Sequence, residues 1–239
     1  MKKYVAVAMM LFVLACFACG ISAQTAEATY GGDDSVIGSG QTAGGQERSA
    51  GMKNFLRLHM YNNTFEDVPA NSWYTKAVKT AYEYGIINGR TKTTYCPSEQ
   101  VSCLEVITVA ARIHAQYYQN EIEREDLFKN WYEPYVRYAY RNGLIDTDVV
   151  ENVPADRQYT ARIMSAVIDA EDMPALRGWK PFADVELENE YAEYIRQLYC
   201  AGIIDGTGNN KFEPHSDLTR AQFAMFIHRI LIPAERISG

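Results

Sequence analysis

The sequence is poor in basic residues. It holds 23 Lys and Arg against 30 Asp and Glu among 239 residues, a formal net charge of -7. A protein that binds the phosphate backbone of a nucleic acid is expected to carry a basic patch. The charge balance therefore excludes nucleic acid as an expected partner.

Cysteine is also scarce, and its spacing fits no metal. Cys16 and Cys19 fall in an apolar N-terminal segment, which leaves Cys96, Cys103 and Cys200. Because three is an odd number and the spacing matches no zinc pattern, we expect neither a metal site nor a cofactor. Cys96 and Cys103 can pair after export or remain free thiols, and the sequence leaves both open.

Recognisable catalytic patterns are missing. His59, His114, His215 and His228 stand at unrelated positions with no Ser or Cys motif beside them, so a catalytic triad has no basis. The segment Gly206-Thr-Gly-Asn-Asn lacks the Gly-Lys-Ser/Thr ending of a phosphate-binding loop. We therefore expect a protein that is not an enzyme.

One long apolar run, at the N-terminus, indicates export. Two lysines precede apolar residues from Tyr4 to about Ala23, the order of a secretory signal, which we assign to residues 1–23. Three fates are open: cleavage, retention as a membrane anchor, or lipidation at Cys16, whose preceding Val-Leu-Ala is similar to a lipobox. A membrane partner is expected only if the segment is retained or lipidated.

Residues 24–53 are expected to form a flexible linker. This stretch consists mainly of Gly, Ser, Ala, Gln and acidic residues, with almost no large apolar side chain up to Gly51. Such a composition cannot offset the entropy lost on ordering.

An internal repeat organises the rest of the chain. Its markers are Gly85, Gly143 and Gly202, which follow similar apolar segments and stand 58 and 59 residues apart. At fixed distances around these glycines stand equivalent residues: Trp73, Trp131 and Glu190 twelve positions before, and Ser102, Thr160 and Thr219 seventeen positions after.

Each repeat is predicted to form two helices. Apolar residues recur at helical spacing before each glycine, and the glycine ends that helix in the left-handed conformation. The second helix is expected to begin at Ser102, Thr160 and Thr219. Ser102 with Glu105, and Thr219 with Gln222, form capping boxes. No helix pair of this length buries its own apolar face, so the three second helices should pack into one bundle.

The third repeat resembles the S-layer homology family. The resemblance rests on Phe182-Ala-Asp-Val-Glu, Ala201-Gly-Ile-Ile-Asp-Gly206, Lys211-Phe-Glu-Pro214 and Leu218-Thr-Arg-Ala-Gln-Phe. The first repeat carries a similar pattern and the second is the most divergent. We assign the repeats to residues 64–117, 128–171 and 182–232.

The resemblance implies an all-α fold, in which three helix-loop-helix repeats form a three-pronged pseudo-threefold spindle around a central three-helix bundle. It also implies an exported, non-catalytic anchoring module at the cell wall or cell surface. Its partner would be a secondary cell-wall polysaccharide linked to peptidoglycan. Binding in this family is non-covalent and often involves a pyruvylated amino sugar.

In this family an Arg at the start of the second helix is associated with the anionic ketal. Arg220 alone holds that place, because Cys103 and Ala161 fill the other two. A helix N-terminus with free amides and a guanidinium suits a carboxylate. The expected ligand-binding residues are Arg220, Thr219, Gln222, Asp184, Gly206, Trp73 and Asp67.

Structural roles compete with these assignments. Arg220 could instead pair with Asp217 or Asp184, and Asp67 and Asp184 could brace turns. Arg162, one position past the motif, is interpreted as a solvated side chain. For the whole protein, the alternative is a degenerate repeat lipoprotein or membrane-anchored protein that acts in protein-protein interaction or envelope structure.

Overall fold

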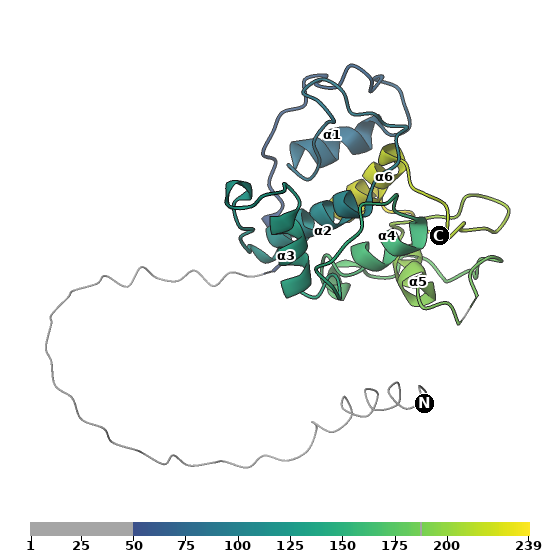
Figure 1. Ribbon diagram of the computed structural model, residues 1–239. Coiled ribbons are helices and arrows are strands. Elements are labelled where there is room, and N and C mark those ends of the chain that lie inside the picture. The colour runs from purple at the N-terminus through teal and green to yellow at the C-terminus, as the bar shows by residue number, and fades with distance from the viewer. Residues whose placement is uncertain (1–49, 187) are drawn as a thin grey trace, which may run out of the picture. The chain divides into compact units, whose positions relative to one another are not determined.

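The computed structural model describes residues 50–186 and 188–239, and the regular elements among them are helices joined by loops (Figure 1). The α-helices are α1 (Thr75–Glu83), α2 (Cys103–Tyr118), α3 (Glu133–Arg141), α4 (Arg157–Met164), α5 (Ala192–Cys200) and α6 (Arg220–Leu231). Short 3-10 turns are η1 (Met52–Asn54), η2 (Glu125–Leu127), η3 (Ala170–Asp172) and η4 (Pro233–Glu235). Within this part of the chain there is no β-sheet, which confirms the all-α prediction.

The expected signal and most of the expected linker lie outside the described residues. Residues 50–53 of that linker are described, and Gly51 donates its backbone N–H to the carbonyl of Tyr117 at 3.1 Å. Among the described helices, none combines the length and the apolar character needed to cross a bilayer.

The repeat glycines end the first helices as predicted. Gly85, Gly143 and Gly202 follow α1, α3 and α5 with φ of 69°, 72° and 71°, the left-handed region that side chains disfavour. The same geometry at three positions confirms that each repeat turns at its glycine.

The second helices begin where capping side chains stand. Ser102 and Thr219 form the predicted capping boxes at α2 and α6. The predicted start at Thr160 is wrong: α4 begins at Arg157, and the N-cap is Asp156, whose carboxylate accepts from the Tyr159 N–H at 2.8 Å. Aspartate caps as well as threonine does, and the loop before α4 is four residues shorter than its counterparts.

The helices pair across repeats. α1 of the first repeat packs on α6 of the third, α3 of the second on α2 of the first, and α5 of the third on α4 of the second (Figure 1). Each first helix thus covers a second helix of another repeat, and the three repeats close on one another in a circle. The three-pronged outline and the central bundle of second helices stay predictions.

A ring of backbone hydrogen bonds joins the three repeats just before their second helices. The N–H of Val101 donates to Leu218, Leu218 to Ala155, and Ala155 back to Val101, at 2.9, 3.0 and 2.9 Å. The three side chains are buried. The ring fixes the starts of α2, α4 and α6 next to one another.

The described cysteines, Cys96, Cys103 and Cys200, are all free. Of the two possibilities left by the sequence, the structure therefore has the unpaired thiols. Burial raises the pKa of the Cys103 thiol, which keeps it protonated at neutral pH.

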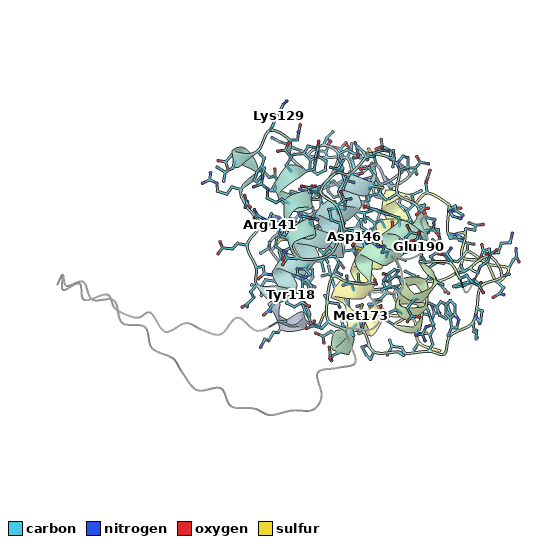
Figure 2. The ribbon with its side chains drawn as sticks, turned by 60° about the horizontal axis from the view of Figure 1, so that its bottom comes forward. Tyr118, Lys129, Arg141, Asp146, Met173 and Glu190 are labelled. Atoms are coloured by element: carbon cyan, nitrogen blue, oxygen red, sulfur yellow. The ribbon has the colours of Figure 1, made fainter. Side chains whose placement is uncertain are left out.

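A polar cluster joins the C-terminal half of α2 to α3 and η3. The His114 ring, buried beside Tyr118, has its Nδ1 2.8 Å from the hydroxyl of Tyr138. The hydroxyls of Tyr117 and Tyr118 donate to Asp169. Tyr118 and Met173, next to η3, lie toward one edge of the molecule and Lys129 toward the other (Figure 2).

We predict that His114 makes the fold acid-sensitive. Burial lowers its pKa from 6.5 to about 4, so the unfolded chain takes up a proton at higher pH than the folded chain. The stabilisation is complete above pH 6.5 and is lost as the pH falls toward 4. Urea unfolding should show that His114→Gln loses about 2 kcal/mol less stability than the parent between pH 7 and pH 5. An unchanged loss in the variant would refute this.

We predict that Gly202→Ala destabilises the fold more than Gly143→Ala. Both positions have the same left-handed backbone, so each variant loses about 1–2 kcal/mol to backbone strain. A Cβ on Gly143 meets nothing within 4 Å, whereas one on Gly202 would stand 2.2 Å from the carbonyl oxygen of Ile237. Thermal unfolding should show a further loss of about 1–3 kcal/mol for Gly202→Ala. Equal losses would mean that the C-terminal segment moves aside freely.

Candidate functional site

A cavity of about 380 Å³ lies between the three repeats and is called here the Arg220 groove. The first repeat supplies its loop and one face of α2, η2 between the first and second repeats supplies Glu125, the second repeat supplies Trp131, and the third supplies Arg220. Its polar and aromatic lining comprises Asn88, Arg90, Tyr95, Glu105, Thr108, Arg112, Glu125, Trp131 and Arg220.

Arg220 is buried and held by the loop of the first repeat. Its Nε donates to the Tyr95 carbonyl at 2.8 Å, and its Nη2 to the Asn88 carbonyl at 2.9 Å. The guanidinium carbon stands 4.5 Å from the centre of the Tyr95 ring. The cation thus has one fixed orientation.

Glu105 is the acid that Arg220 meets. Arg220 Nη1 donates to Glu105 Oε1 at 2.7 Å, and Arg90 Nη1 donates to the same oxygen at 2.6 Å. Neither Asp217 nor Asp184, the partners considered from the sequence, forms an ion pair with Arg220 within the described residues. One carboxylate therefore lies between two guanidinium groups.

Trp131 and Arg112 add an aromatic surface and a third cation. The Trp131 side chain is 50% exposed and packs edge-on against Tyr132 at 5.7 Å. Arg112 donates from Nη1 to the Ile86 carbonyl at 3.2 Å and from Nη2 to the Tyr135 hydroxyl at 3.0 Å. The groove combines an exposed indole with three arginines, a chemistry suited to a ring that carries an anionic group.

The amides at the start of α6 are not free, and this part of the expectation is wrong. The N–H of Arg220 donates to Glu99 at 2.8 Å and that of Ala221 to Pro97 at 3.0 Å. The next amide, of Gln222, donates to the Thr219 hydroxyl. Loop carbonyls and the Thr219 hydroxyl accept from these three backbone amides. A ligand can therefore bind the Arg220 guanidinium but not the amides at the start of α6.

Of the seven predicted ligand-binding residues, only Arg220 lines this groove. Thr219 and Gln222 cap α6. Trp73 is 62% exposed at the start of α1. Gly206 lies against Phe182 and the Lys211 carbonyl, where a Cβ would clash.

The two predicted aspartates hold loops. Asp67 accepts from the N–H groups of Tyr95 and Cys96 at 2.7 and 2.6 Å. Asp184 accepts from those of Phe212 and Glu213, both at 2.8 Å. These carboxylates brace the loops that surround the arginines, and the backbone bonds lower the pKa of Asp184.

Arg157 is a second motif cation that the sequence analysis missed. The ungapped alignment put Ala161 in the motif position of the second repeat, but with α4 starting after Asp156 the residue in that position is Arg157. The statement that only Arg220 keeps the family's cation is therefore wrong. A capping aspartate directly before an Arg is the signal that a gapped alignment would have used.

The environment of Arg157 repeats that of Arg220. Its Nε donates to the Phe212 carbonyl at 2.7 Å and its Nη2 to the Asp205 carbonyl at 2.9 Å. Its guanidinium carbon stands 4.4 Å from the centre of the Phe212 ring. Phe212 and Asp205 hold the same places after Gly202 as Tyr95 and Asn88 hold after Gly85. Each cation thus enters the loop of another repeat.

The third equivalent position has lost the cation. Cys103 begins α2, and its N–H donates to the Val153 carbonyl at 2.9 Å. A cavity of about 280 Å³ lies here and includes Cys103, Tyr159 and Arg162 in its lining. Arg162 was interpreted as solvated, but its side chain is 24% exposed and pairs with Asp146.

We predict that Arg157→Ala destabilises the fold more than Arg162→Ala. Truncation at Arg157 leaves the buried carbonyl of Phe212 and the partly buried carbonyl of Asp205 without their donor, at a cost of about 2–4 kcal/mol. Arg162 pairs with an exposed Asp146, so its loss costs about 1 kcal/mol or less. Denaturant titration of both variants measures the difference, and equal costs would contradict the structural role of Arg157.

The comparisons with known proteins agree with this architecture. A sequence profile of the S-layer homology domain matches residues 64–102 and 181–224, in the first and third repeats. An S-layer protein of Bacillus thuringiensis subsp. finitimus is 25% identical over 69% of this chain and 21% of its own length. An amylopullulanase of Thermoanaerobacterium thermosulfurigenes is 26% identical over 72% of this chain and 10% of its own.

An endoglucanase of Bacillus sp. (strain KSM-635) is 22% identical over 70% of this chain and 18% of its own length. The chain thus spans about a tenth to a fifth of the length of these relatives. An S-layer protein, an amylopullulanase and an endoglucanase share this region, so it occurs next to different remaining parts in these relatives. Residues 64–102 and 181–224 are thus similar to the S-layer homology domain, and this likeness supports a cell-surface anchoring module.

Proposed function

We propose that this protein is held non-covalently on a secondary cell-wall polysaccharide through a carboxylate-bearing sugar bound in the Arg220 groove. The observation that carries the proposal is a buried, fixed Arg220 beside the half-exposed indole of Trp131 in one groove. The two segments that match the S-layer homology domain and the S-layer relative support a role at the cell surface.

The groove offers complementary contacts to such a sugar. The indole of Trp131 can cover the apolar face of a pyranose ring, and Arg90 and Arg220 present N–H donors to a carboxylate. A pyruvyl ketal is such a group, because it places a carboxylate on the rim of an otherwise neutral sugar.

Arg157 supports a second site of this kind on the same chain. Its loop, its stacked ring and its donors repeat those of Arg220. Two sites on one chain that engage one polymer raise the overall affinity through effective concentration. Retention on a polymer is favoured by this arrangement even if each sugar binds weakly.

The Cys103 position favours the second candidate, an interaction protein built from degenerate repeats. It lacks a motif cation, and the nearby side chains of Val149 and Val153 are 80% and 46% exposed. An apolar surface of this kind suits a protein partner better than an anionic sugar. This candidate predicts binding to envelope protein, with no dependence on the wall polymer.

We predict that the exported protein sediments with wall sacculi that retain their secondary polymer and not with stripped sacculi. Trp131→Ala and Arg220→Ala should each weaken binding. For Arg220 the expected loss is about 1.5–3 kcal/mol, the range for a hydrogen bond to a charged group, or roughly 10- to 150-fold. Co-sedimentation at graded protein concentrations gives these affinities.

Two matched variants serve as controls. Tyr140 is an aromatic of the second repeat, 48% exposed like Trp131, but it does not line the Arg220 groove. Arg196 is an exposed cation on α5 paired with Glu193. Tyr140→Ala and Arg196→Ala should bind like the parent. Circular dichroism must show that all four variants fold. The proposal is contradicted if the parent protein does not bind polymer-bearing sacculi. It is also contradicted if folded Trp131→Ala and Arg220→Ala bind with the affinity of the parent.

A further inference from the structure

The carboxylate of Glu105 occupies the place where a ligand carboxylate would meet the cations of the Arg220 groove. Its Oε1 accepts from Arg220 Nη1 at 2.7 Å and from Arg90 Nη1 at 2.6 Å. Its Oε2 accepts from the Ser102 N–H at 2.9 Å and from Arg90 Nη2 at 3.3 Å. The remaining donors of Arg220 point to loop carbonyls. An incoming anion therefore competes with Glu105 for the same N–H groups.

The Arg157 site differs at several equivalent positions: Asp205, Thr207 and Phe212 stand where the Arg220 groove has Asn88, Arg90 and Tyr95, and the third residue of the second helix also differs. Glu105 is the third residue of α2, and the third residue of α6 is Gln222. Gln222 makes the same cap, since its Oε1 accepts from the Thr219 N–H at 2.9 Å, but it carries no charge. Among the described residues no acid lies within ion-pair distance of Arg157, whereas Arg220 has Glu105.

We propose that the third residue of the second helix determines how tightly each site binds a carboxylate-bearing sugar. Glu105 acts as an internal competitor that occupies N–H donors of Arg90 and Arg220, whereas Gln222 adds no competing charge at the Arg157 site. This inference rests on the proposed function and deepens it. It makes the two sites unequal: Glu105 must be displaced before the Arg220 groove takes the carboxylate, whereas no ion-paired acid has to be displaced from Arg157.

The protein itself supplies the variants that test this. Glutamine already caps α6, so Glu105→Gln preserves the cap of α2 while it removes the competing charge. Glutamate already caps α2, so Gln222→Glu preserves the cap of α6 while it adds one. Both exchanges are nearly equal in volume, so the fold should not change, and thermal unfolding checks this.

The probes are the methyl glycoside of a pyruvylated amino sugar and the same sugar without the pyruvyl group. Calorimetry on the exported protein should show that Glu105→Gln binds the pyruvylated probe about tenfold more tightly at its weaker site. Gln222→Glu should weaken the stronger site about tenfold. The neutral sugar should respond to neither exchange, and Arg220→Lys should abolish the gain from Glu105→Gln.

Three outcomes would overturn the inference: no tighter binding by folded Glu105→Gln, no weaker binding by folded Gln222→Glu, or an equal change for the neutral sugar. If these occur while the parent still sediments with polymer-bearing sacculi, only this inference fails. If the parent binds neither sacculi nor probe, the proposed function fails and the inference fails with it.

Discussion

The architecture depends on the ring of three backbone hydrogen bonds between Val101, Ala155 and Leu218. Each residue belongs to a different repeat and stands two positions before the first residue of its second helix. Because the ring is closed, moving one helix start would break bonds to both others. The amides two residues further on bond in the opposite cyclic sense, from Cys103 to Val153, from Arg157 to Ser216 and from Arg220 to Glu99. Position and direction of the second helices follow from this arrangement.

The cations are placed by the same ring. A residue at the first position of α4 or α6 already has its backbone bonded to the loop of another repeat, so its side chain enters that loop. Arg157 and Arg220 then stack on Phe212 and Tyr95 and bond loop carbonyls. Burial lowers the pKa of Arg157, but a guanidinium stays charged at any physiological pH. These contacts therefore do two things: they hold the loops in place, and they keep a positive charge at a fixed position.

Local signals in the sequence predicted local structure well. The glycine turns and the two capping boxes depend on residues within four positions of one another, and all appeared where expected. The start of α4 was misassigned because Thr160 happened to keep the ungapped spacing, although Asp156 caps equally well. The Arg220 groove could not be predicted, since its lining comes from three repeats and the pairing of Arg220 with Glu105 spans 115 positions.

Because Arg157 and Arg220 each enter the loop of another repeat, a single repeat does not contain a complete site. A gene segment that encodes one repeat encodes the loop of one site and the cation of a different one. Because the first repeat has Cys103 where the other two have an arginine, the incomplete site lies beside the loop of the second repeat, not its own. A substitution in one repeat thus alters a site whose loop belongs to another repeat. Duplicating or removing a single repeat would separate cations from loops at both of its borders.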